Sequence, residues 1–517
     1  MNMNGNNSIK FTDVPESLWI GTTGDTDYPS LEDDIDVDVA IVGAGITGLT
    51  TAYLLRGRGL KIAIIEANRI AKGVSAHTTA KITSQHTLKY YKMINAVGEE
   101  KARQYAEANQ SAIGLIEKII RDNNIDCDFK RVPAYVFTQD RNMVRKLEDE
   151  TEAALKLGLP AEYTETLDLP FGVEGAMKFA NQAYFHPRKY LLALAGLIVG
   201  KDCEIYENTR AVDIQDGSPN IVVTDNGRKI RAKYVIQATR YPFYDKPGLY
   251  FARVYPQRTY LMALRVKGSF PEGMYISADE PSRTLRPHTG SDISVVLVGG
   301  ENHKTGHGKN LHNHYEIIRD FAKPMLDIES IPYRWSAQDY TAMDEIPFIG
   351  PMTAGRESIF IATGYDKWGI TNGSAAAMII TDLITKGESP WEEVYSPSRF
   401  TPAVSAKNFI KENLDVAVNL ISGKLNIPDG DVEIEKGEAK ITEVDGYKVG
   451  VYRDNDGELH YVSTTCTHLG CELKWNSAEL SWDCPCHGSR FTYTGEVIEG
   501  PALESIKPLE SDLGTGD

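Results

Sequence analysis

The feature that most restricts the possible folds is a glycine-rich turn between a buried strand and a helix, close to the N-terminus. Residues 36–42 alternate and then become continuously apolar, the turn Gly43-Ala-Gly45-Ile-Thr-Gly48 follows, and residues 49–58 have the spacing of a helix. A second apolar strand, 61–65, ends at Glu66, 23 residues after Gly43, where a carboxylate can accept hydrogen bonds from both ribose hydroxyls of an adenosine. This order predicts a dinucleotide-binding α/β domain, and an acid at position 66 disfavours a 2′-phosphate such as that of NADP. The alternative is a glycine-rich turn without a ligand.

Two short loops near the other end of the chain combine cysteine with histidine. They read Cys466-Thr-His468 and Cys484-Pro-Cys486-His487, so each loop offers thiolate and imidazole ligands together. A Rieske 2Fe-2S centre uses such a set, with cysteines on one iron and histidines on the other, whereas zinc fingers normally pair like residues in each half. The loops resemble the ligand boxes of Rieske proteins and predict Cys466, His468, Cys484 and His487 as cluster ligands. A zinc site and four structural residues without a metal remain the alternatives.

The resemblance to Rieske proteins of cytochrome bc-type complexes implies three further features. Cys471 and Cys486 match the pair that forms a disulfide between the two ligand loops. Ser489 matches a serine whose hydroxyl donates to a cluster sulfur, which raises the reduction potential. Phe491 stands where high-potential members have a tyrosine, so one hydrogen bond is missing. We therefore expect a potential within the Rieske span of about −150 to +300 mV, below its upper end.

The first three quarters of the chain resemble a superfamily of flavoproteins. From Asp36 to about Lys386 the chain is similar to glycine oxidase, D-amino-acid oxidase and dimethylglycine dehydrogenase, in the βαβ unit and in segments 234–239, 344–350 and 364–373. This resemblance implies FAD rather than NAD. The remaining cofactor contacts that it implies are Ala238, Thr239, Gly364, Gly369 and Thr371. A helix that starts near Thr371 would also direct its free N–H groups at the flavin and stabilise the reduced ring.

His77 is the residue whose position most invites a chemical role in this half. In dimethylglycine and sarcosine dehydrogenases, a histidine eleven residues after the ribose-binding acid is bonded covalently to the flavin, and His77 stands eleven residues after Glu66. The surrounding sequence differs from those enzymes because it lacks their tryptophan before the histidine. We include His77 among the cofactor-binding residues, with a covalent link and a noncovalent packing role both open.

The substrate site departs from the flavoprotein pattern. In glycine oxidase, an arginine eight residues before the proline of a Pro-x-x-Gly segment binds the substrate carboxylate, and counting back eight from Pro347 gives Asp339. A carboxylate cannot bind another carboxylate near neutral pH, so an amine that pairs with Asp339 is favoured over a plain α-amino acid. The alternative is that Asp339 caps or solvates a loop. Lys367, Arg286 and the neighbouring His288 are the other polar candidates, and we name Asp339, Lys367 and Arg286 as catalytic residues.

The predicted organisation follows the two resemblances. We expect a Rossmann-type α/β FAD-binding domain, an interleaved α+β substrate domain and a small C-terminal antiparallel β domain. The predicted ranges are a polar lead-in at 1–35; the FAD-binding domain at 36–90, 181–245 and 335–392; the substrate domain at 91–180 and 246–334; a linker and helical tether at 393–426; and the Rieske domain at 427–517. In the tether, Phe409, Leu414, Val416 and Leu420 have helical spacing.

Composition limits the partners and the compartment. A net charge of −17 over 517 residues argues against nucleic acid and against an anionic membrane surface. The chain has no run of eighteen apolar residues, and residues 1–10 lack the apolar segment of a signal peptide, so we expect a cytoplasmic protein without membrane insertion. Cys127 and Cys203, outside the cluster motif, are interpreted as unpaired thiols.

These features together predict a flavin-dependent oxidoreductase with two redox centres. We expect that a small substrate with a C–H bond next to nitrogen delivers a hydride to FAD, and that electrons leave one at a time through the cluster to an external acceptor. The direction stays open, since a donor could also feed electrons in through the cluster, as in a reductase or oxygenase. A redox sensor or electron-transfer protein without amine turnover is the alternative from another class.

Overall fold

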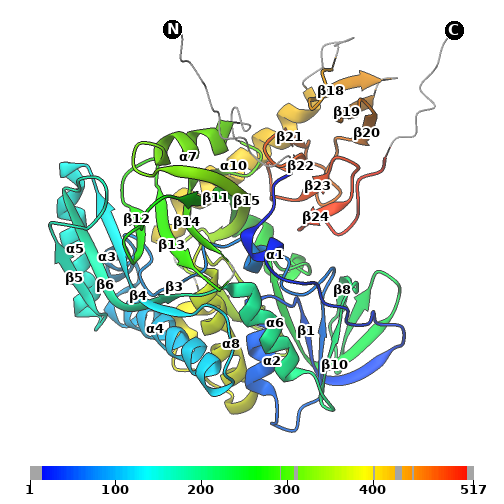
Figure 1. The fold of residues 1–517 in the computed structure, drawn as a ribbon. Helices are drawn as coiled ribbons and strands as arrows, with labels where there is room; N and C mark the ends of the chain where they lie inside the picture. The colour runs from blue at the N-terminus through cyan, green and yellow to red at the C-terminus, as the bar shows by residue number, and fades with distance from the viewer. Residues whose placement is uncertain are drawn as a thin grey trace.

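The protein is described from a computed structural model, in which residues 14–291, 293–307, 313–399, 402–425, 434–444 and 447–508 are placed. Their strands form an eight-stranded sheet, a nine-stranded sheet and two small antiparallel sheets of three and four strands. The first two sheets lie in the larger lower part of the molecule and the small sheets lie together above them (Figure 1).

The eight-stranded sheet has a parallel core. The order β16-β17-β10-β1-β2-β7 is parallel from β17 to β7, β16 is antiparallel to β17, and β9 and β8 extend from the first half of β10. Its strands are β1 (Ile35–Val42), β2 (Ile62–Ile65), β7 (Cys203–Tyr206), β8 (Ala211–Gln215), β9 (Asn220–Thr224), β10 (Lys229–Arg240), β16 (Phe348–Pro351) and β17 (Ile359–Thr363). All four residues of β2 and the last four of β1 are buried, as expected for strands covered on both faces.

Helix α2 contacts both α6 and α8, and α2 and α8 pack against strands of this sheet (Figure 1). Gly373 of α8 allows the close approach to α2. An added methyl carbon at Gly373 of α8 would come within 2.8 Å of the Ile46 side chain of α2. The helices of the chain are α1 (Leu18–Gly21), α2 (Ile46–Leu55), α3 (Tyr90–Val97), α4 (Glu99–Asp122), α5 (Val144–Lys156), α6 (Pro187–Ile198), α7 (His314–Ala322), α8 (Gly369–Lys386), α9 (Glu392–Tyr395) and α10 (Pro402–Leu425).

The nine-stranded sheet is mixed and is built from two separate stretches of sequence. Its order is β15-β11-β14-β13-β12-β4-β6-β3, with β5 paired to β6. The strands are β3 (Lys81–Ile82), β4 (Lys130–Thr138), β5 (Ala161–Thr164), β6 (Gly175–Tyr184), β11 (Val254–Val266), β12 (Met274–Ser277), β13 (Thr284–Thr289), β14 (Ser294–Lys304) and β15 (Ile328–Ala342). The long strands β11 and β15 are antiparallel neighbours, and β15 leads directly back to β16 of the first sheet.

The C-terminal part is a small all-β unit. Its three-stranded sheet contains β18 (Ala439–Val444), β19 (Tyr447–Arg453) and β20 (Leu459–Ser463), and its four-stranded sheet contains β21 (Lys474–Asn476), β22 (Ser481–Asp483), β23 (Arg490–Thr492) and β24 (Val497–Glu499). The predicted fold class, a parallel α/β domain with an interleaved second domain and a small antiparallel β domain, is confirmed.

The predicted tether forms helix α10, but the four apolar residues with helical spacing do not all lie on one buried face of this helix. Val416 and Leu420 pack against the core of the C-terminal unit, whereas Phe409 and Leu414 are exposed. The rotation of the helix agrees with its ion pairs, since Lys304 of β14 pairs with Glu412 at 2.7 Å and also with Asp415. Contacts with two neighbours, rather than periodicity alone, therefore determine which side of α10 is covered.

Candidate functional site

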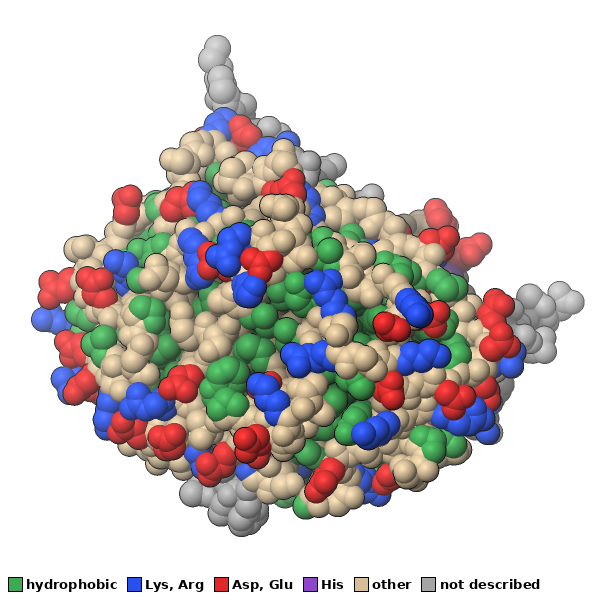
Figure 2. Space-filling model, turned by 90° about the horizontal axis from the view of Figure 1, so that it is seen from below, with side chains coloured by type: hydrophobic (Ala, Val, Ile, Leu, Met, Phe, Trp, Pro, Cys, Tyr) green, Lys and Arg blue, Asp and Glu red, His purple; other side chains and the backbone are tan. Residues whose placement is uncertain are grey.

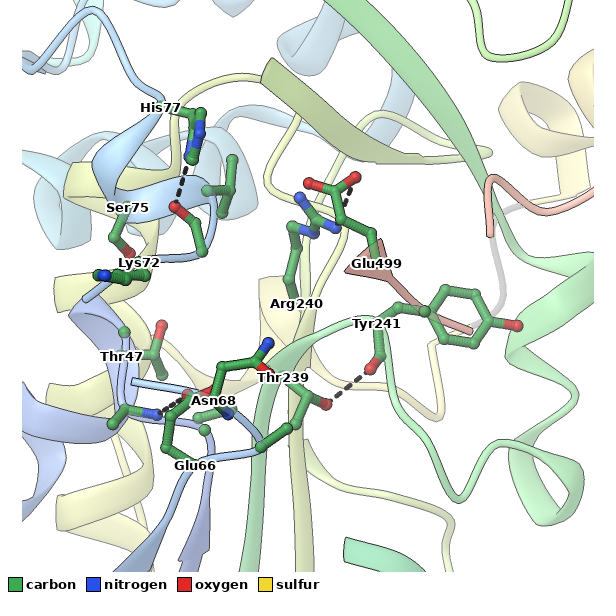
Figure 3. Close-up of a pocket in the computed structure, with 18 of the residues that line it drawn as sticks. Thr47, Glu66, Asn68, Lys72, Ser75, His77, Thr239, Arg240, Tyr241 and Glu499 are labelled. Atoms are coloured by element: carbon green, nitrogen blue, oxygen red, sulfur yellow. Dashed lines mark hydrogen bonds and ion pairs between the residues drawn. The ribbon is translucent and has the colours of Figure 1, made fainter. Parts of the chain in front are cut away.

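The glycine-rich turn forms one end of a cavity at the carboxyl end of β1. A methyl group at Gly48 would overlap the carbonyl oxygen of Gly43, so the first turn of α2 requires glycine there. The Glu66 carboxylate accepts a hydrogen bond from Ala44 N (3.0 Å) with one oxygen and from Asn68 N (3.2 Å) with the other. Figure 3 shows Glu66 and Thr47 at this end of the cavity. The N-terminus of α2 and the acid predicted to bind ribose thus lie together, as the pyrophosphate and ribose of a dinucleotide require.

The structure brings most of the predicted cofactor residues to this one cavity. Its lining includes Gly43, Gly45, Glu66, His77, Ala238, Thr239 and Gly369. Gly48, Gly364 and Thr371 do not line it; Thr371, for example, donates its hydroxyl to Thr83 O at 3.0 Å. Helix α8 nevertheless begins at Gly369, in the lining, so its N-terminal N–H groups are directed at the cavity as expected.

His77 lies on the opposite side of the cavity from Arg240 (Figure 3). Its Nδ1 is 2.9 Å from Gly73 O, and its backbone carbonyl accepts a hydrogen bond from the Trp335 indole at 3.0 Å. Burial lowers the pKa of His77, so the neutral ring is favoured. A neutral imidazole in the cavity wall can pack against a flavin or be bonded covalently to it. Covalent attachment of the flavin to His77 stays a prediction.

Two of the three predicted catalytic residues reach the cavity. Asp339 of β15 and Lys367, which precedes α8, both line it. Burial raises the pKa of Asp339 to about 6, although Arg240 and Lys367 oppose that shift. The Asp339 carboxylate is thus ionised above about pH 6.

Arg286 lies outside the cavity lining. Its side chain is fully buried, Nε donates to Thr79 O (2.5 Å), and the guanidinium lies 4.6 Å from the ring centre of Tyr184. His288 is also buried, against the indole of Trp19 from the N-terminal segment. These side chains pack between α1 and the nine-stranded sheet, and a catalytic role of Arg286 stays a prediction.

The two ligand loops form a second site in the C-terminal unit. Each loop is a tight turn, closed by Gly470 N donating to Cys466 O (3.0 Å) and Gly488 N donating to Cys484 O (3.0 Å). A disulfide joins Cys471 to Cys486, with 6.5 Å between the Cα atoms. The bridge that the resemblance implied therefore connects the two loops.

The donor atoms of these loops fit a cluster with mixed ligands. The Nδ1 atoms of His468 and His487 are buried without a hydrogen-bond partner among the residues that the structure describes. The rings of these histidines are 5.0 Å apart, and the Cys466 and Cys484 thiols are in hydrogen-bonding contact with each other. Burial lowers the pKa of His487 to about 3, which leaves its nitrogen lone pair free for a metal. Two thiols and two orphaned imidazole nitrogens match the Rieske ligand set.

The second ligand loop is pressed against strands β11 and β15 of the nine-stranded sheet. Tyr340 donates its hydroxyl to His487 O (2.9 Å) and lies 3.1 Å from Gly500 O, and Gln338 Nε2 donates to Gly488 O (2.8 Å). An added methyl carbon at Gly488 would be 2.6 Å from Pro256. The loop therefore fits this surface only because position 488 has no side chain.

The histidine of the first loop faces the end of β10. His468 Nε2 is 3.7 Å from Asp245 Oδ2, and the Tyr241 hydroxyl donates to the same carboxylate oxygen at 2.7 Å. Because Tyr241 follows Thr239 and Arg240, which line the cavity, one short segment of chain extends from the flavin cavity to the cluster loops.

The C-terminal unit also closes the cavity itself. Residues of β24 and the segment after it line the wall beside Arg240, together with one side chain of β23 and one from the turn between β21 and β22; the full set is Glu479, Arg490, Ile498, Glu499, Gly500, Pro501, Ala502 and Leu503. Sequence reasoning missed this contribution, as well as Arg240. Arg240 directly follows the predicted Ala238-Thr239 segment and could have been included, but no local pattern marks Glu499.

Comparison with known proteins decides the family. Residues 38–383 match the family described as DAO, FAD dependent oxidoreductase, and residues 427–510 match the Rieske [2Fe-2S] domain. The chain belongs to the FAD-dependent oxidoreductase family. This oxidoreductase is 45% identical over 501 residues to YhfW of Bacillus subtilis (strain 168), which is named as a Rieske 2Fe-2S iron-sulfur protein; the match covers 97% of this chain and 98% of YhfW.

Two more distant proteins share the flavoprotein part. Gamma-glutamylputrescine oxidoreductase of Escherichia coli (strain K12) is 23% identical over 385 residues, covering 69% of this chain and 85% of that protein. Glycine oxidase from Geobacillus kaustophilus has the same fold, with a TM-score of 0.60 at 18% identity over 71% of this chain and 99% of that chain. The predictions of FAD and a Rieske 2Fe-2S cluster as cofactors are confirmed, and with them the prediction of an oxidoreductase.

The face of the molecule shown in Figure 2 has charges of both signs. Lysine and arginine side chains alternate with acidic ones on the face shown in Figure 2, so this face has no continuous basic patch for nucleic acid. Among the residues that the structure describes, no helix has the length and apolarity needed to cross a bilayer.

Proposed function

We propose that this oxidoreductase dehydrogenates an amine at the flavin cavity and passes the electrons through the Rieske centre to an external acceptor. The observation that carries the proposal is the packing of the cluster loops on the strands that line the flavin cavity, with Tyr340 bonded to the backbone of His487. When bound, FAD supplies a two-electron acceptor for a hydride and the cluster a one-electron carrier. The packing of the two sites against each other within one chain supports a relay.

Asp339 supports an amine as the substrate. Its carboxylate faces the cavity and is ionised above about pH 6, so it can hold an ammonium or amine N–H group beside the flavin position. The relative named gamma-glutamylputrescine oxidoreductase agrees with a nitrogen-containing substrate. Lys367 lines the same cavity, close enough to Asp339 to oppose the rise of its pKa, and would contact a second polar group of the substrate.

Residues of the C-terminal unit have a role in this reaction besides electron transfer, at the wall of the substrate cavity. The wall formed by the segment from Ile498 to Leu503 covers the cavity beside Asp339, which excludes water and strengthens the ion pair between Asp339 and the substrate. The same wall fixes the cluster loops relative to the cavity, so substrate binding and electron exit share one structural element.

An anaerobic titration of the purified protein with a panel of primary, secondary and polyamine substrates tests the proposal. Absorption follows the flavin and electron paramagnetic resonance follows the cluster. We expect at least one amine to bleach the flavin and to produce a Rieske-type signal in the same sample. In a Cys484→Ser variant the amine should still bleach the flavin, without the cluster signal.

Three other outcomes would contradict the proposal. Dithionite reduction of both centres with no response to any amine would favour an electron-transfer or sensor role. Flavin bleaching without cluster reduction would remove the relay. Reduction of the flavin by an external donor only when the cluster is present would reverse the direction of electron flow, as in a reductase or oxygenase.

A further inference from the structure

A carboxylate of the Rieske domain stands inside the flavin cavity, surrounded by arginines. Glu499, the last residue of β24, has its Oε2 atom 3.6 Å from the guanidinium of Arg240, 3.8 Å from that of Arg258 and 3.8 Å from that of Arg490. Figure 3 shows the Glu499 carboxylate facing Arg240 on the wall of the cavity. The three arginines come from β10, β11 and β23, so three parts of the molecule meet at this carboxylate.

The guanidinium groups are held in place by other partners. Arg258 donates to Ser336 Oγ (2.6 Å) and Gln338 Oε1 (3.0 Å), Arg490 donates to Asp483 (3.1 Å), and Arg240 donates to Gln338 O (2.6 Å). The arginine geometry therefore does not depend on Glu499 alone. These contacts hold the three guanidinium groups in place around Glu499, with Asp483 and Glu479 as further carboxylates that pair with Arg258 and Arg490.

The pairing of Glu499 with these guanidinium groups is electrostatic. Glu499 Oε2 is buried without a hydrogen bond among the described residues, since 3.6–3.8 Å exceeds a normal hydrogen-bond length. Burial alone would raise the pKa of Glu499, but Arg240, Arg490 and Arg258 outweigh burial and hold that pKa at about 2. The carboxylate is thus charged at any working pH. Among the described side chains, the carboxylate that lies within 4 Å of the Arg240 guanidinium is that of Glu499.

We propose that Glu499 occupies a carboxylate-binding position of the flavin cavity, so that the Rieske domain itself fills this position and excludes the carboxylate of a substrate. The consequence for substrate class rests on the proposed function: the enzyme accepts amines whose reacting carbon bears no carboxylate, because Glu499 already pairs with Arg240 and because Asp339, which lines the same cavity, can pair with an amine. The Rieske domain then determines specificity as well as electron transfer.

Removal of the Glu499 side chain should create a site for an external carboxylate. In the FAD-loaded, cluster-loaded protein, we expect Glu499→Ala to bind sodium acetate, seen as a saturable perturbation of the flavin absorption spectrum and as a rise of about 2 °C or more in the unfolding midpoint. Sodium chloride at equal ionic strength and the neutral analogue acetamide should produce neither effect. The wild type and Glu499→Gln, in which a side chain still fills the position, should not respond to acetate.

The comparison of these variants decides the proposal. Acetate binding by the alanine variant alone supports it. An alanine variant that folds and ignores acetate, or a wild type that binds acetate equally well, would overturn it. If Glu499→Ala does not fold because Arg240 loses its carboxylate and Arg258 and Arg490 are left with Asp483 and Glu479 alone, the double variant Glu499→Ala/Arg258→Met removes one of the three positive charges while Arg240 and Arg490 remain, and the same acetate test applies to it. No amine turnover is required, so failure of the proposed function and failure of this inference are separately detectable.

Discussion

The cluster site and the catalytic end of the flavin cavity differ in how far apart their residues lie in the sequence. The four predicted cluster ligands lie within residues 466–487, on two turns that a disulfide joins. The end proposed to be catalytic combines His77, Arg240, Asp339, Lys367 and Glu499, from distant parts of the chain. The first site depends on local turn geometry, whereas the second exists only after both large sheets and the C-terminal unit have packed together.

Because of this difference, substitutions should destroy a local site without damage to the neighbouring site. A distributed site should respond to substitutions in several domains. The contacts of Tyr340 and Gln338 with the second ligand loop are where the two kinds of site meet. Substitutions on either side of this contact can therefore distinguish effects that are confined to one site from effects on both sites.

Loss of one cluster ligand should have the largest effect and should remain confined to the cluster. We expect Cys484→Ser to abolish the Rieske electron paramagnetic resonance signal completely, because one iron loses a thiolate, while FAD content stays near that of the wild type. Cys203→Ser, which changes a buried thiol in β7, is the matched control and should keep the signal. A parallel loss of FAD from Cys484→Ser would show that the two sites are not independent.

Removal of the charge at Asp339 should lower kcat/KM for the best amine by about 100-fold, the worth of a hydrogen bond between charged groups. The pH dependence follows from the raised pKa of Asp339, about 6: the carboxylate becomes protonated as the pH falls through that value, so kcat/KM of the wild type should fall there. Steady-state kinetics from pH 5 to 8 would measure both effects.

The neutral Asp339→Asn variant should have no step near pH 6, and Asp213→Asn on an exposed strand position should behave as the wild type does. An unchanged pH profile in Asp339→Asn would mean that another group controls binding of the amine.

A methyl group at Gly48 should weaken the nucleotide end of the cavity to a smaller degree. Its overlap with Gly43 O must displace the first turn of α2, at a cost of about 1–3 kcal/mol in unfolding free energy and roughly tenfold in FAD affinity. FAD fluorescence titration of the apoprotein and thermal unfolding measure these changes. Gly114→Ala, a helical glycine with open space around it, should be neutral, and equal effects of the two substitutions would argue against the close contact.

The smallest expected effect concerns the potential of the cluster. Phe491 is fully buried in the core of the Rieske domain, and Phe491→Tyr should add one hydrogen bond toward a cysteine ligand. A bond of about 1 kcal/mol corresponds to a rise of about 40 mV for a one-electron couple. Redox titration followed by circular dichroism or paramagnetic resonance would detect this rise, with the exposed Phe409→Tyr as the control. A fall in potential would contradict the resemblance at this position.

The parts of the molecule that could be predicted from sequence are those in which neighbours in sequence are also neighbours in space. The βαβ turn places Gly43 and Glu66 at one strand end, and the two ligand loops are complete within themselves. Asp339 was located only through its distance from Pro347 in a known pattern. Arg286 was predicted as a polar candidate, and its guanidinium lies over the rings of Tyr184 and Trp19. A sequence does not distinguish an arginine that packs on aromatic rings from one that binds a substrate.

The covered side of α10 and the contribution of Glu499 could not be predicted for one shared physical reason. Both depend on how the C-terminal unit sits against the two large sheets, and the charge pairs that fix it, such as Lys304 with Glu412 and Arg240 with Glu499, join positions more than one hundred residues apart. Periodicity describes one element at a time and contains no information on such pairs.

Tyr340, whose hydroxyl lies between the carbonyl groups of His487 and Gly500, limits how this protein can evolve or be rebuilt. A Rieske domain from another protein, grafted at the tether, could carry all four ligands and still lack the segment that closes the cavity. Such a chimaera would contain both redox centres and an open substrate site. The fusion is therefore not modular: the two halves of this chain have to change together.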